Sequence, residues 1–100
     1  RRDMIRKSHP ESKIYEFING FEACAFLEAK SLVSFESEQW VVISDFYMPI
    51  KKGDEVMKMC EKIGINKKCI VSSASDLDLD VTIFKKNKDN ELLKDWISQL

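Results

Sequence analysis

The feature that most constrains the fold is a run of five residues, WVVIS, that ends at a carboxylate. The run spans Trp40 to Ser44, and Asp45 follows it directly. Consecutive Val and Ile residues predict a strand that is buried on both faces, as in a parallel sheet. Open parallel sheets bind their ligands beyond the carboxyl ends of the strands. We therefore predict that Asp45 is the reactive group of a site at this end of the sheet.

Strand and helix patterns alternate along the chain. β-branched and aromatic residues predict strands at four places: residues 13–18, 40–45, 68–73 and 81–86. Apolar residues at helical spacing predict helices at 21–30, 54–64 and 89–100, and the back half of another before Pro10. This alternation predicts an α/β fold, a three-layer parallel sheet with helices on both faces.

Composition limits the classes of function. One hundred residues are enough for a single domain, 1–100. A net charge of −1, with acids and bases interspersed, argues against nucleic acid or a membrane surface as the partner. Three cysteines within apolar patterns indicate buried thiols in a reducing compartment, so we expect a cytoplasmic protein. The single histidine, His9, argues against a histidine-based metal site or catalytic dyad.

The residues after Ser44 form a motif. Asp45, Met48, Pro49 and Gly53 stand in the order D-x-x-M-P-x-x-x-G, which resembles the receiver domain of two-component response regulators. The resemblance covers nearly the whole chain and implies a flavodoxin-like fold. It implies that Asp45 accepts a phosphoryl group from a histidine kinase or a phosphotransfer protein. Such a domain acts in a phosphorelay rather than as an enzyme, and its other partners are an output domain or a second copy.

Two further strand ends carry polar residues, Ser73 and Lys85. Right-handed crossovers bring such ends to the same edge of the sheet as Asp45. A hydroxyl can donate to a phosphoryl oxygen, and an ammonium can neutralise its charge. The resemblance implies these roles for Ser73 and Lys85. The alternatives are a capping serine, a solvated edge lysine, and Ser72 in place of Ser73 as the hydroxyl.

The resemblance also implies a Mg²⁺ site, formed by Asp45, the backbone carbonyl of Tyr47 and two acids at the end of a first strand. Mg²⁺ requires oxygen ligands in octahedral geometry. The chain begins about where the family's first helix would begin, so this strand and its acids are absent from it. We expect the missing strand to lie between the strands at 13–18 and 40–45, supplied by a longer chain or by a partner chain.

The usual output face of the family is expected to be incomplete. Thr82 stands where the family has an aromatic switch residue, and Lys86 stands where a proline follows the lysine. The interval before the last predicted strand leaves little room for a fourth helix. We expect the partner surface at other aromatic residues, if they are exposed: Trp96, or Phe21 and Phe26.

The sequence around Asp45 has two interpretations other than a phosphoacceptor. A degenerate receiver-like module would bind its partner on the same scaffold without phosphorylation. A hydrolase of the haloacid-dehalogenase type would need a second aspartate two residues on as its general acid and base, and Tyr47 stands there instead. The first alternative stays open, and the second is rejected.

Alternating acids at Asp76, Asp78 and Asp80 are similar to the start of a calcium loop. That loop needs a glycine at its sixth position and a glutamate at its twelfth, where this chain has Val81 and Asn87. The alternation instead predicts an extended segment with one solvated face.

Overall fold

The structure, a computed structural model, describes residues 1–33, 35–46, 52–73 and 77–100. Helices and strands alternate over these ranges, as the sequence predicts for an α/β fold. The elements are α1 (Arg2–Ser8), α2 (Gly20–Ser31), a 3-10 turn η1 (Ser37–Gln39), β1 (Val41–Asp45), α3 (Gly53–Ile63), β2 (Lys67–Ser72), β3 (Thr82–Lys85) and α4 (Asn90–Ser98).

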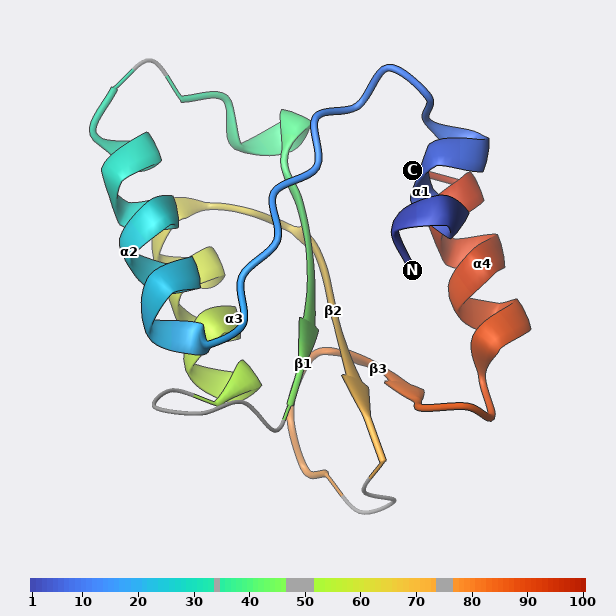
Figure 1. Cartoon of the computed structure of the whole chain (residues 1–100). Helices are drawn as coiled ribbons and strands as arrows, with labels where there is room; N and C mark the ends of the chain where they lie inside the picture. Colours follow the sequence, from blue (N-terminus) through green and yellow to red (C-terminus); the bar gives the residue numbers. More distant parts are fainter. Residues whose placement is uncertain (34, 47–51, 74–76) are drawn as a thin grey trace.

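The three strands form one parallel sheet in the order β1-β2-β3. The middle strand β2 is the most buried of the three, and Cys69 and Ile70 have no exposed surface. All three strands run in the same direction, so their carboxyl ends meet at one edge of the sheet (Figure 1). The predicted parallel sheet is confirmed, and three of the four predicted strands are correct to within one residue at each end.

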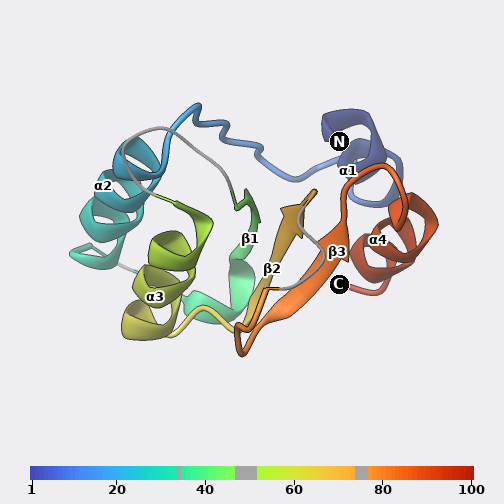
Figure 2. The ribbon, with the colours of Figure 1, turned by 90° about the horizontal axis from the view of Figure 1, so that it is seen from below.

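The helices lie on two sides of the sheet (Figure 2). Helices α2 and α3 cover one side, and α1 and α4 cover the other. Successive side chains of a strand point to opposite faces, and β2 follows this rule. Ile70 packs in the cluster that includes Leu27, Val56 and Cys60. Cys69 and Val71 pack in a second cluster with the buried apolar residues of β3 and α4.

The predicted strand at 13–18 is wrong, because this segment pairs with no strand of the described sheet. It connects α1 to α2 along an extended path (Figure 1). The rings of Tyr15 and Phe17 pack on Phe26, with centroid distances of 4.7 and 5.0 Å. Since a strand is defined by hydrogen bonds to a neighbouring strand, β-favouring composition alone does not make one. The apolar residues of this segment are used for packing on α2 instead.

The helix boundaries have local causes. The side chain of Asn19 accepts a hydrogen bond from the Glu22 backbone N–H at 2.8 Å and so caps the start of α2. Gly64 ends α3 with a φ of 88°, the left-handed conformation that glycine adopts most easily.

Residues 77–81 contain no helix, which agrees with the short interval before β3. No helix among the described residues is both long and apolar enough to cross a bilayer.

The alternation predicted after residue 76 is present in the part that the structure describes. Leu77 and Leu79 are half-buried and pack against the α2–α3 side of the core, whereas Asp78 and Asp80 are exposed. Asp76 lies outside the described residues. The three cysteines are buried free thiols, as predicted.

Candidate functional site

Asp45 is the last residue of β1 and stands at the edge where the strands end. Its side chain is 40% exposed, so a solvent-borne reagent can reach the carboxylate. The guanidinium of Arg1, just before α1, donates a hydrogen bond to Asp45 Oδ1 at 2.7 Å. One residue beyond the strand, the Phe46 N–H donates a hydrogen bond to the Val71 carbonyl of β2 at 3.0 Å. The candidate acceptor is therefore accessible, held on a paired strand and ion-paired to a cation.

Gly53 packs directly against the backbone that carries Asp45. A Cβ atom at this position would lie 2.5 Å from the Asp45 carbonyl oxygen and 2.9 Å from the Phe46 Cα. The Gly53 N–H donates to the Phe46 carbonyl at 2.8 Å, which fixes the first turn of α3 on the strand end. Since both clashes would involve backbone atoms, the glycine of the motif is required by this close approach. Met48, Pro49 and Tyr47 lie outside the described residues.

The other two predicted site residues come to the same edge. Lys85 ends β3 and pairs in register with Ser72 of β2, and the Lys86 N–H donates to the Ser72 carbonyl at 2.8 Å. Ser72 is 2% exposed, whereas Ser73 is exposed and follows the strand end. Of the two serines, Ser73 is the one whose hydroxyl is open to an incoming group.

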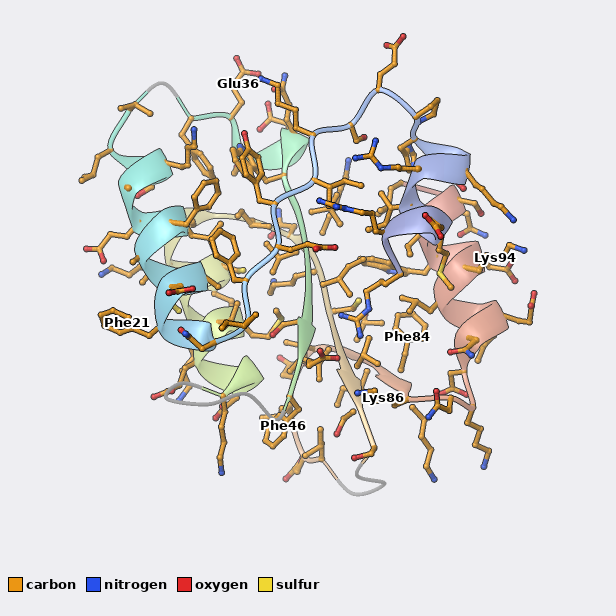
Figure 3. The ribbon with its side chains drawn as sticks, in the orientation of Figure 1. Phe21, Glu36, Phe46, Phe84, Lys86 and Lys94 are labelled. Atoms are coloured by element: carbon orange, nitrogen blue, oxygen red, sulfur yellow. The ribbon has the colours of Figure 1, made fainter. Side chains whose placement is uncertain are left out.

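The predicted site residues stand at the same edge of the sheet, and their side chains are not bonded to one another. Figure 3 shows Phe46, just past β1, and Lys86, just past β3, at the same end of the sheet. Within the described ranges, no hydrogen bond or ion pair joins the side chains of Asp45, Ser73 and Lys85. The edge therefore carries a carboxylate at Asp45, an exposed hydroxyl at Ser73 and an ammonium at Lys85.

The described residues do not make up the expected Mg²⁺ site. Over these ranges, no group of three or more His, Cys, Asp or Glu residues is placed to hold a metal ion. Asp45 is one expected ligand, and the Tyr47 carbonyl lies outside the described residues. One carboxylate paired with a guanidinium does not supply the several oxygens that Mg²⁺ requires.

Two residues at this edge were missed by sequence reasoning. Arg1 reaches Asp45 across 44 positions, and no local pattern reports a contact of that span. Asp89 accepts a hydrogen bond from the Lys85 N–H at 2.8 Å and so fixes the turn in which Asn87 has a φ of 64°. The Asn-Lys-Asp run before α4 was a usable turn signal, since Asn and Asp favour such conformations.

The aromatic residues proposed as a partner surface separate into two groups. Phe26 is half-buried among the rings of Tyr15, Phe17 and Trp40. Trp96 is half-buried too, with its ring edge-on to that of Phe84 at 6.0 Å. Phe21 is 55% exposed and points away from the body of the molecule (Figure 3).

Comparisons with known proteins add no relative: no protein-family model, curated protein or solved structure matches this chain. A function is therefore inferred from the motif around Asp45 and from the groups that the parallel sheet gathers at one edge.

Proposed function

We propose that this chain is a receiver-like domain with a flavodoxin-like fold, and that Asp45 accepts a phosphoryl group in a two-component relay. One observation carries the proposal: Asp45 ends a strand of a parallel sheet, with the motif glycine packed on its backbone. The division of helices, α2 and α3 on one side and α1 and α4 on the other, supports the same fold. The donor is a histidine kinase or a phosphotransfer protein, and the buried free thiols suit the cytoplasm.

The chemistry follows from the three groups at this edge. A carboxylate oxygen of Asp45 attacks phosphorus, the bond from phosphorus to the donor breaks, and an acyl phosphate forms. In this proposal the Lys85 ammonium neutralises the transferred oxygens and the Ser73 hydroxyl donates to one of them, and both residues stand at the strand ends of the same sheet. Asp45 need not be deeply buried for this role, because the donor protein must reach it.

The edge is incomplete for this reaction without further acids, and in the described sheet the outer edge of β1 pairs with no strand. The Phe46 N–H points to β2, so by the alternation of parallel strands the backbone groups of Ile43 and Asp45 point away from it. Arg1 touches Asp45, so α1 begins at the carboxyl end of β1. A parallel strand preceding α1 would therefore end beside Asp45, which is where acids are needed.

A second candidate is favoured by the Arg1 contact. The guanidinium 2.7 Å from Asp45 occupies the carboxylate with a fixed cation, and among the described residues no metal-binding cluster competes for it. In that case the chain is a receiver-like interaction module that binds its partner without phosphorylation.

The test compares the chain as it stands with a version extended before Arg1 by one strand that ends in two acids. Both are treated with acetyl phosphate and Mg²⁺, and intact-mass spectrometry detects a hydroxylamine-sensitive phosphoryl adduct. The controls are Asp45→Asn and Asp78→Asn, the latter removing an exposed carboxylate far along the chain.

For a phosphoacceptor we expect rapid labelling of the extended chain only, lost in Asp45→Asn and retained in Asp78→Asn. The chain as it stands should also bind Mg²⁺ weakly. Absence of labelling in both versions would favour the interaction module. Rapid labelling of the unextended chain, lost in Asp45→Asn, would show that further acids are not needed.

A further inference from the structure

Arg1 and Asp45 form an ion pair between the start of a helix and the end of a strand. The guanidinium of Arg1 donates to Asp45 Oδ1 at 2.7 Å, and the Arg1 side chain is 33% exposed. Among the described residues the guanidinium makes this one hydrogen bond, so its other N–H groups are available to a further acceptor. The planar fork of a guanidinium matches two oxygens of a phosphoryl group.

The helix that carries Arg1 is anchored to the body of the molecule. The Arg1 carbonyl accepts a hydrogen bond from the Ile5 N–H at 3.1 Å, in the first turn of α1. Met4 and Ile5 pack against the core cluster on the α4 side of the sheet. His9 Nε2 donates to the Ile97 carbonyl of α4 at 2.7 Å. The position of Arg1 beside the sheet therefore follows from the docking of α1 against α4 (Figure 1).

Arg2 provides a contrast, because it carries the same group on the next residue. It pairs with Glu16 at 3.4 Å, and its side chain is 48% exposed. Neighbouring residues of a helix project in different directions, so the start of α1 directs one of its two arginines to Asp45. The contact with Asp45 is thus a property of position 1 and not of a general positive charge at this end of the helix.

We propose that Arg1 binds the phosphoryl group on Asp45 and positions it at the edge of the sheet, an inference that rests on the proposed function. With acetyl phosphate as donor, an Asp45 oxygen bonds to phosphorus, the bond from phosphorus to the acetate oxygen breaks, and acetate leaves with the electron pair. The acyl phosphate carries more negative charge than the carboxylate and presents further oxygens. The guanidinium contacts these oxygens through the N–H groups that the carboxylate leaves unused.

A phosphoryl-binding arginine differs from an ordinary surface ion pair in two measurable ways. An exposed pair contributes little and is replaced nearly as well by any cation. A guanidinium that holds two oxygens of one anion binds it more tightly than an ammonium does, because the ammonium has the charge without the fork. Arg1→Lys therefore separates the two roles, and Arg2 supplies a matched position for comparison.

The experiment measures the binding of inorganic phosphate, so it does not require phosphorylation. Asp45→Asn removes the competing carboxylate and leaves the Arg1 guanidinium to bind the anion. Phosphate is titrated into this variant without divalent cations and at fixed ionic strength, and amide and arginine Nε–H resonances report binding. The same variant is also prepared with Arg1→Gln, with Arg1→Lys and with Arg2→Gln. Every version keeps the amino group of residue 1, and circular dichroism verifies that each is folded.

We expect Arg1→Gln to weaken phosphate binding about tenfold or more, because a charge-assisted hydrogen bond is lost. Arg1→Lys should cause a smaller loss, and Arg2→Gln should change the affinity less than about twofold. Absence of phosphate binding to Asp45→Asn would overturn the inference. Equal losses in Arg1→Gln and Arg2→Gln would overturn it too, since binding would then depend on charge alone.

The same substitutions in the extended chain distinguish this inference from the proposed function. With acetyl phosphate, Arg1→Gln should be labelled about tenfold more slowly than Arg2→Gln. Equally fast labelling of both variants would overturn the inference and leave the proposed function standing. Phosphate binding that depends on Arg1, with no labelling of any version, would overturn the proposed function and support Arg1 as the oxyanion-binding residue.

Discussion

Helices α2 and α3 lie side by side on the same side of the sheet (Figure 1). Their solvent-exposed faces differ in polarity. Both bury an inner face in one cluster, α2 through Leu27 and α3 through Val56. The outer face of α3 carries charged residues such as Lys58 and Glu61, whereas that of α2 carries Phe21. An amphipathic helix such as α3 is fully explained by the core it covers. The core formed by the described residues does not account for the exposed Phe21 and Leu32 of α2.

The two helices also begin differently. Asn19 caps α2 through its side chain, whereas at the start of α3 the Glu55 side chain accepts a hydrogen bond from the Lys52 N–H at 3.3 Å. The start of α2 is thus fixed by a local hydrogen bond, and the start of α3 by a local hydrogen bond together with the packing of Gly53 on the end of β1. Substitutions at these places measure how far this difference extends.

The largest effect is expected from the inner face of α2. Leu27→Ala removes a buried side chain from the shared cluster and should lower the free energy of unfolding by about 2–5 kcal/mol. Leu32→Ala makes the same chemical change at an 81% exposed site and should cost less than about 0.5 kcal/mol. Urea unfolding measures both. Equal costs for the two variants would mean that α2 is not buried through one face only.

The next effect concerns the two glycines that bound α3. Gly53→Ala places a methyl group against the Asp45 and Phe46 backbone and should cost about 1–3 kcal/mol. Gly64→Ala meets Ser37 side-chain atoms only at 3.5 Å and beyond, so its cost of about 1–2 kcal/mol comes from the left-handed backbone alone. The variants differ in a second readout: Gly53→Ala should shift the amide resonances of Asp45 and Phe46, and Gly64→Ala should not. Unshifted resonances in Gly53→Ala would contradict the packing described for the motif.

The sequence correctly predicted those strands and helices whose pairing and packing partners are present in the described structure. The Trp40 to Asp45 run, the strand after Lys67 and the helix that ends at Gly64 all have their partners in the described structure. Residues 13–18 have the same kind of composition but no strand to pair with, so the prediction of a strand there was wrong. Strand composition predicts apolar packing, and hydrogen-bonded pairing depends on a neighbour that the segment itself does not encode.

The candidate site, too, could be predicted only where it does not depend on contacts between distant segments. The ends of the predicted strands are enough to bring Asp45, Ser73 and Lys85 to one edge, because parallel connections leave little choice. The Arg1 contact could not be predicted, since it depends on how α1 docks beside the sheet. The choice between Ser72 and Ser73 depended on where β2 ends, which the structure places at Ser72.

A smaller effect is expected at the helix starts. Asn19→Ala removes the acceptor of the Glu22 N–H and should cost about 1 kcal/mol, with fraying of the first turn of α2. Lys52→Ala removes a side chain that has no capping bond and should be close to neutral. Hydrogen exchange of the Glu22 and Glu55 amides reports each helix start separately. Faster exchange at Glu55 in Lys52→Ala would show that the Lys52 side chain supports the start of α3 in addition to the bond from its N–H to the Glu55 carboxylate.

A last effect concerns the buried face of α3 and depends on pH. Burial raises the pKa of the Cys60 thiol on α3 to about 12, partly offset by the nearby charge of Lys68. An unfolded thiol titrates near its ordinary value of 9.0, so between these values the folded chain binds the extra proton. The stabilising contribution of this protonated thiol is therefore complete below pH 9 and is lost as the pH rises toward 12. The difference in urea midpoint between the unmodified chain and Cys60→Ala should shrink over that interval. Met57→Leu, a non-titrating change on the same buried face, should show a constant difference, and a constant difference for Cys60→Ala as well would contradict the shift.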